Sequence, residues 1–119
     1  MNAYAQAHSA YATLSPVRSD RANELEAFQR VTALLRGANS HQKLVTALHK
    51  NRDLWSILAA EVARADNPLP AQLRAQIFYL AEFTVHQSRK VLNKDASVDA
   101  LIDVNNSMIA GLSGSELAA

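Results

Sequence analysis

Apolar residues recur every three or four positions in four segments of the chain, which is the spacing of one face of an α-helix. The first segment runs from about Asp20 to Arg36, with Ser19 as a candidate N-cap and Gly37 at its end. The second opens after Ser40, another candidate N-cap, and is predicted to reach about Arg64. The predicted buried faces are Leu25, Phe28, Val31, Thr32 and Leu35 in the first segment, and Leu44, Leu48, Trp55, Leu58 and Val62 in the second.

The stretch "DNPLP" separates the second segment from the third. Pro68 and Pro70 are tolerated only in the first turn of a helix, so the third helix is predicted to start there. It is predicted to end near Asn93, a residue that accepts left-handed backbone angles. Ser97 is a candidate N-cap for the fourth helix. The predicted buried faces are Leu73, Ile77, Leu80, Ala81, Thr84, Ser88 and Val91 in the third segment, and Leu101, Val104, Met108 and Leu112 in the fourth.

Four helices with short connections predict an all-α fold, namely a small antiparallel four-helix bundle. Residues 1–18 form an N-terminal segment that we expect to be weakly ordered or docked on a partner, because an isolated helix of this length is marginal. Residues 19–112 form a single helical domain, and residues 113–119 have the Gly and Ser content of a flexible tail.

Charge and composition narrow the range of partners. Twelve Lys and Arg residues against eleven Asp and Glu residues give a net charge of +1, so we expect no direct nucleic-acid partner. The chain has no cysteine, which excludes disulfides and thiolate chemistry. No window approaches the roughly 18 apolar residues of a membrane span, and the first residues lack the pattern of a signal peptide. We therefore expect a cytoplasmic protein without membrane insertion.

The sequence contains no recognised set of catalytic or cofactor-binding residues. The histidines, His8, His41, His49 and His86, are scattered and show no metal-ligand spacing. Glu82 and His86 lie one helical turn apart and could act as a base and its orienting partner, but a narrow polar strip is more typical of a solvated helix edge. We expect no enzymatic activity, no cofactor and no metal site.

Two asparagines, Asn51 and Asn105, interrupt the apolar faces of the second and fourth segments. A buried amide must be hydrogen-bonded, so the favoured interpretation is a pair across helices that fixes the register of the bundle. The alternative is contact with a ligand. Trp55, one turn after Asn51, is assigned to the core.

More apolar side chains are present than one buried face per helix requires. Tyr79 and Phe83 point away from the face that contains Ile77, and Leu54 and Ile57 fall outside the face of the second helix. They belong either to a wider core or to an exposed surface that binds another protein, such as a groove that receives an amphipathic helix. Such a surface would serve a homodimer equally well.

Two long stretches carry a resemblance to a known family. They are "NRDLWSILAAEVARADNPLPAQLRAQIFYLAEFTVHQSRKVL", residues 51–92, and "LIDVNNSMIAGL", residues 101–112. The combination of N-x-x-L-W, N-x-L-P, I-F-x-L-A-x-F and L-I-D-V-N resembles the FlaF family of flagellar biosynthesis regulators. The similarity runs from the first predicted helix to Leu112, with one departure at Glu61, where the family pattern has aspartate.

The resemblance implies a cytoplasmic protein, without enzymatic activity, that works with flagellin and with the regulator FlbT. Two roles are implied. The first is a flagellin-binding secretion chaperone that couples flagellin synthesis to export. The alternative is a regulatory adaptor that binds FlbT and controls translation of flagellin mRNA without chaperoning flagellin.

The beginning of the chain, "NAYAQ", is similar to the opening of FliS, a flagellin chaperone built as a helical bundle. By this similarity the N-terminal segment would cover the partner groove or clamp the bound chain. This similarity makes Tyr4, Tyr11 and Leu14 candidate partner contacts, and the surplus of apolar side chains on the second and third helices adds Leu54, Ile57, Tyr79 and Phe83.

Overall fold

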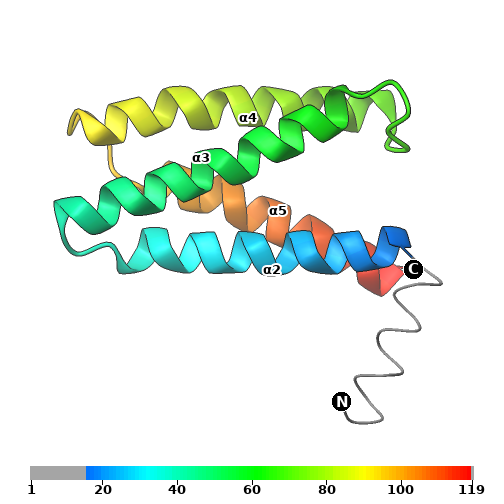
Figure 1. Cartoon of the computed structure of the whole chain (residues 1–119), viewed down its shortest axis with the longest axis horizontal. Coiled ribbons are helices and arrows are strands. Elements are labelled where there is room, and N and C mark those ends of the chain that lie inside the picture. Colours follow the sequence, from blue (N-terminus) through cyan, green and yellow to red (C-terminus); the bar gives the residue numbers. More distant parts are fainter. Residues whose placement is uncertain (1–15, 119) are drawn as a thin grey trace, which may run out of the picture.

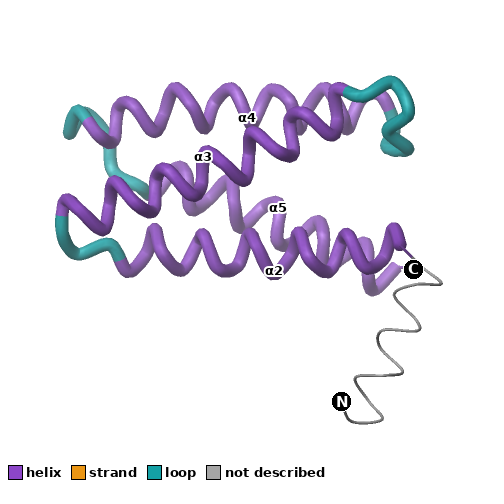
Figure 2. The backbone as a smooth tube through the Cα atoms, in the orientation of Figure 1, coloured by secondary structure: helices purple, strands orange, loops and turns teal. Residues whose placement is uncertain are grey.

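Four α-helices make up the described part of the chain: α2 (Pro16–Gly37), α3 (His41–Ala63), α4 (Ala71–Leu92) and α5 (Asp99–Ala118). The computed structural model describes the backbone of residues 16–118 and the side chains of residues 22–112. Successive helices run in opposite directions, and loops occur only at the two ends of the bundle (Figures 1 and 2). The most extensive helix contacts are α3 with α4 and α2 with α5; α2 contacts α3 less, and α4 contacts α5 less still. The predicted antiparallel four-helix fold is confirmed.

The N-cap of α3 agrees with the sequence prediction, and the starts of α5 and α2 differ from it. Ser40 has extended backbone angles, and its hydroxyl accepts a hydrogen bond from the Lys43 N–H at 3.2 Å. The Ser97 hydroxyl accepts one from the N–H of Asp99, the first residue of α5, also at 3.2 Å, but it is the Val98 carbonyl that accepts the first hydrogen bond of that helix, from Ile102. The prediction that Ser19 caps the first helix is wrong, because α2 begins at Pro16. Proline suits the first helical position, since its fixed φ is already helical and its missing N–H would have had no partner there.

The start of α4 and the left-handed turn that follows its end differ from the sequence prediction. The helix begins at Ala71, with Pro70 as its N-cap, so Pro68 lies in the preceding loop. At the other end Asn93 has a φ of −83°, and Lys94 is the residue in the left-handed region, with a φ of 63°. The helix thus ends as predicted, but the left-handed turn comes one residue later.

Residues 1–15 and 119 lie outside the described residues. The prediction for the N-terminal segment, residues 1–18, therefore concerns mostly residues that are not described. At the C-terminal end, the sequence predicts a flexible tail at residues 113–119. The backbone of α5 continues as a helix to Ala118.

The core consists of two apolar clusters, one toward each end of the bundle. The first cluster is next to the α3–α4 loop and includes Phe28 and Trp55, whose rings meet edge to face with centroids 5.3 Å apart. The second cluster lies near the other two loops. The buried members of the first are Phe28, Trp55, Leu58, Val62, Ile77 and Ala81, and those of the second are Leu35, Ala47, Leu48, Val91 and Leu101.

A layer of buried polar residues separates the two clusters. Each helix has one or two buried polar residues, and these fall along the helix between a residue of the first cluster and a residue of the second. Each is at most 1% exposed, although none is apolar. This polar layer consists of Thr32 on α2, Asn51 on α3, Thr84 and Ser88 on α4, and Asn105 on α5.

One predicted core residue lies at the surface instead. Leu73 is 40% exposed, because it lies in the first turn of α4, beside the α3–α4 loop at the end of the bundle. The remaining predicted positions on α4 are buried or half-buried.

Candidate partner-binding surfaces

The candidate residues on α3 lie on a flank just outside the core. Leu54 is half-buried and packs against the first apolar cluster, whereas Ile57 is 59% exposed. Ile57, Glu61 and Arg64 follow each other at intervals of four and three residues, so they form one stripe along the helix. This stripe leads from an exposed apolar side chain to a polar cleft at the end of the bundle.

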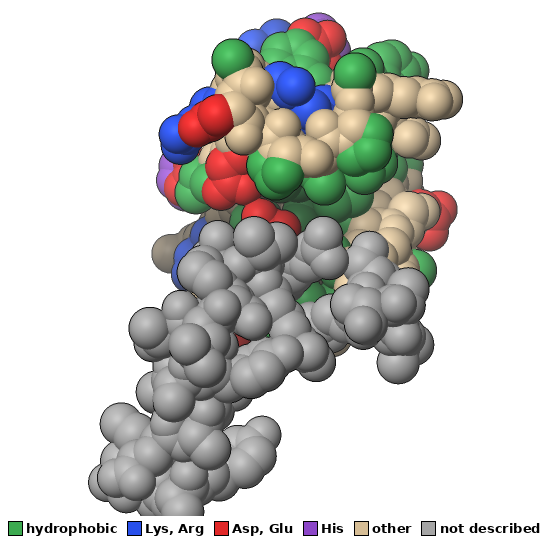
Figure 3. All heavy atoms as spheres, turned by 90° about the vertical axis from the view of Figure 1, so that its right-hand side faces the viewer, with side chains coloured by type: hydrophobic (Ala, Val, Ile, Leu, Met, Phe, Trp, Pro, Cys, Tyr) green, Lys and Arg blue, Asp and Glu red, His purple; other side chains and the backbone are tan. Residues whose placement is uncertain are grey.

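The polar cleft lies between the beginning of α2 and the α3–α4 loop. It has a volume of about 500 Å³ and is lined by Asn23, Glu24, Glu61, Arg64, Asp66, Asn67 and Pro68. Viewed from this end of the bundle, Figure 3 shows acidic side chains beside hydrophobic ones. The side chains that line the cleft are mostly polar, whereas the neighbouring Ile57 flank exposes an apolar side chain.

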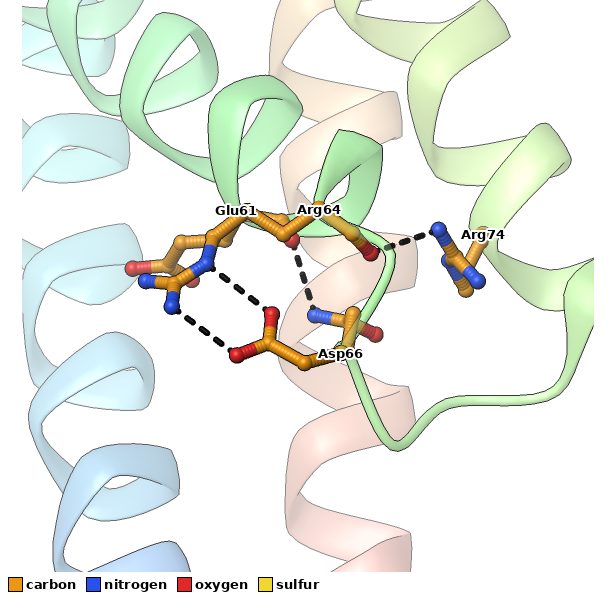
Figure 4. Close-up of polar contacts among 5 residues, drawn as sticks. Glu61, Arg64, Asp66 and Arg74 are labelled. Atoms are coloured by element: carbon orange, nitrogen blue, oxygen red, sulfur yellow. Dashed lines mark hydrogen bonds and ion pairs between the residues drawn. The ribbon is translucent and has the colours of Figure 1, made fainter.

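Hydrogen bonds fix the loop that forms one wall of the cleft (Figure 4). Arg64 donates from Nε and Nη2 to the two carboxylate oxygens of Asp66 at 3.1 and 3.0 Å. These hydrogen bonds, together with the charge of the guanidinium, lower the pKa of the Asp66 carboxyl below its ordinary value. Arg74 of α4 donates to the carbonyl oxygens of Val62 and Arg64 at 2.8 and 2.7 Å, and so caps the C-terminal end of α3.

A different flank contains the candidate residues on α4. Tyr79 is 66% exposed, and Phe83 is half-buried. Arg74 donates a hydrogen bond to the end of α3, so the side of α4 that contains Arg74 faces α3. Phe78 lies one helical turn after Arg74 and therefore on the same side. Tyr79 is rotated by about 100° from Phe78 and points away from α3. Tyr79 and Ile57 consequently belong to two separate surfaces.

Three further apolar residues, which are not among the predicted contacts, are exposed. Phe78 is 43% exposed, Val45 41% and Leu34 38%. Phe78 directly follows the buried Ile77, so it lies about 100° around the helix from the core face. This offset could have identified Phe78 as an exposed apolar residue from the sequence. The N-terminal candidates Tyr4, Tyr11 and Leu14 lie outside the described residues.

The two asparagines of the polar layer are hydrogen-bonded to each other. The Asn105 Nδ2 group donates to Asn51 Oδ1 at 2.8 Å, which joins α5 to α3. The indole Nε1–H of Trp55 donates to Asn105 Oδ1 at 2.9 Å. The pairing across helices expected from the sequence is therefore present, and the hydrogen bond from Trp55 extends it.

A model of the flagellar protein FlaF family matches residues 4–112 of this chain. The chain belongs to the FlaF family. The match spans every candidate residue on α3 and α4 and the asparagine pair, and it includes Tyr4, Tyr11 and Leu14. No curated protein and no solved structure matches the chain.

Within the described residues, this FlaF-family chain has no group of three or more His, Asp or Glu side chains that could hold a metal ion. Glu82 and His86 are both exposed. The histidine–carboxylate pair that does meet in the described part is His49 with Asp53, at 3.5 Å on the exposed side of α3. No described helix is long and apolar enough to span a membrane. The surface features that remain are the Ile57 flank with its polar cleft, and the exposed side of α4 around Tyr79.

Proposed function

We propose that this FlaF-family protein is a non-catalytic secretion chaperone that binds flagellin in the cytoplasm and couples its synthesis to export. Membership of a family of flagellar proteins carries this proposal. The exposed apolar side chains of Ile57, Phe78 and Tyr79 are its candidate contacts, because they offer apolar area that a partner could bury.

The physical basis of such a chaperone would be apolar burial. Flagellin segments that become helical in the filament have apolar faces, and a helical bundle can cover them before assembly. Burial contributes about 25 cal/mol per Å² of apolar surface, part of which offsets the entropy lost when the bound segment becomes ordered. Ile57 and Tyr79 are the described candidates that have the most surface to bury in this way.

Size-exclusion chromatography with light scattering tests the proposal. The purified chain is measured alone, with full-length flagellin, and with flagellin that lacks its terminal segments. We expect a one-to-one complex with full-length flagellin only. Equal binding of the truncated flagellin, or no binding of either form, would contradict the chaperone role. The measurement of the chain alone also reports whether the apolar surfaces form a homodimer.

Point variants then locate the contact. Ile57→Ser and Tyr79→Ser each remove an exposed apolar side chain, and Val45→Ser is the matched control, because Val45 is an exposed β-branched residue at the opposite end of α3. We expect at least one of the first two variants to weaken flagellin binding about tenfold or more, as is common for residues central to an interface. The control should bind like the wild type.

The alternative function is a regulatory adaptor that binds FlbT and controls translation of flagellin mRNA. The observation that favours a second partner is that Ile57 and Tyr79 lie on separate surfaces, so two proteins could be bound at once. Binding of FlbT by each variant separates the two roles. If the adaptor role alone holds, a variant will lose FlbT binding while flagellin binding is undetectable even in the wild type.

A further inference from the structure

The hydrogen bonds in the polar layer form a chain with a fixed direction. The indole nitrogen of Trp55 can only donate, so the carbonyl oxygen of Asn105 must face it. The Asn105 amide nitrogen then faces Asn51 and donates to its carbonyl oxygen. The chain therefore ends at the amide nitrogen of Asn51, which is a donor. That nitrogen is buried and has no hydrogen-bond partner among the described residues.

A second buried polar group without a described partner belongs to α4. The Thr84 hydroxyl oxygen makes no hydrogen bond, and Thr84 is 0% exposed. The hydroxyls of the other two small polar residues in the layer are engaged within their own helices. Thr32 donates to the Phe28 carbonyl at 2.6 Å, and Ser88 donates to the Thr84 carbonyl at 2.7 Å.

Residue spacing along α3 and α4 places Asn51 and Thr84 at about the same level of the bundle. The contact between Arg74 and the Val62 carbonyl aligns the antiparallel helices α3 and α4. Asn51 precedes Val62 by 11 residues, and Thr84 follows Arg74 by 10 residues. At about 1.5 Å per residue, both lie roughly 15–17 Å along their helices from that contact. Both side chains are buried between the two apolar clusters.

We propose that the polar layer contains a binding site for one ordered water molecule, held by Asn51 Nδ2 and Thr84 Oγ1. Buried polar groups are almost always hydrogen-bonded to protein or to ordered water, and internal waters typically bind groups that lack protein partners. The water accepts the Asn51 N–H and donates to the Thr84 oxygen, so it extends the chain that begins at Trp55 from α3 to α4. This site is independent of the proposed function.

Crystal structures of the wild type and of two Thr84 variants at high resolution test the proposal. Thr84→Ser keeps the hydroxyl, and Thr84→Val keeps the shape but removes it. In the wild type and in Thr84→Ser we expect a density peak about 2.7–3.2 Å from both the Asn51 nitrogen and the hydroxyl oxygen. In Thr84→Val the peak should be absent. A direct hydrogen bond between the two side chains, or a layer without a water peak in the wild type, would overturn the proposal.

Denaturation gives an independent result whose sign distinguishes a bound water from a dry site. If the water is bound, Thr84→Val removes one of its partners and leaves Asn51 without one, so the urea midpoint should fall below that of the wild type. If Thr84 is dry and unsatisfied, replacing its hydroxyl by a methyl group should raise the midpoint, because an unsatisfied buried polar group is removed. A raised midpoint would therefore refute the site even without a crystal structure of the variant.

Discussion

Asn105 is the central residue of the hydrogen-bond chain, and its replacement by leucine makes a sharp prediction. It accepts a hydrogen bond from Trp55 and donates one to Asn51, and its side chain is 0% exposed. Leucine has a similar branched shape but can form neither bond. Asn105→Leu would therefore leave the Trp55 indole N–H and the Asn51 carbonyl oxygen buried without partners.

The expected loss of stability follows from these two groups. Each unsatisfied buried polar group costs about 1–3 kcal/mol, so the pair costs about 2–6 kcal/mol. Burial of a leucine side chain returns about 1.5–3 kcal/mol. The middle of these ranges gives a decrease of about 2 kcal/mol in the free energy of unfolding. That is a large fraction of the about 5–15 kcal/mol that is typical of a domain.

The assay is urea unfolding, followed by helix circular dichroism and by the fluorescence of Trp55, the single tryptophan of the chain. The variants Asn51→Leu, Asn105→Leu and the double variant form a cycle. The double variant removes the stranded Asn51 carbonyl as well, so its loss should be smaller than the sum of the single losses by about 1 kcal/mol or more. Additive losses, or an Asn105→Leu variant as stable as the wild type, would refute a coupled network.

Four further predictions concern single sites. Ser40→Ala removes the N-cap of α3 and should lower the free energy of unfolding by about 1 kcal/mol, whereas Ser40→Asp, which can still cap, should retain most of it. Phe28→Ala empties a fully buried site and should cost about 3–5 kcal/mol. Tyr79→Ala, at an exposed site, should stay within about 0.5 kcal/mol of the wild type in the same measurement. Arg64 lowers the pKa of the Asp66 carboxyl in the folded protein. The stabilisation from this pair is therefore fully present at a pH above the ordinary pKa of the carboxyl, and it is lost as the pH falls through the lowered pKa of the folded state. An NMR titration should find a higher Asp66 midpoint in Arg64→Gln than in the wild type, and equal midpoints would contradict this origin of the shift.

The sequence predicts the helices and their buried faces well because both depend on local signals. Ser40 caps α3 as expected, since the capping bond joins residues only three apart. The apolar spacing of three and four identifies the faces that contain Phe28 and Trp55, because each helix has one side toward a common core. The start of α2 at Pro16 differs from the prediction because the apolar periodicity begins at Leu25, about two and a half turns after the start of the helix.

The partners of buried polar groups are harder to predict, because they depend on how helices cross. The spacing of the apolar residues indicates that Asn51 and Asn105 are buried, and a buried amide requires a partner. The Trp55 indole can bond to Asn105 only because α5 approaches α3. This approach brings together residues that are 50 positions apart in the sequence. No local pattern contains this information.

The surfaces show the same limit, and it decides which variants can test partner binding. Leu54 and Ile57 fall on one flank of α3 in the sequence, but the position of the neighbouring helices makes Leu54 half-buried against the core and leaves Ile57 exposed. Substitution of Leu54 would therefore change stability and partner contact together, and its effect on binding could not be assigned to either. Ile57 and Tyr79 have little core contact to lose, so a change in flagellin or FlbT binding at these two positions reports on the interface itself.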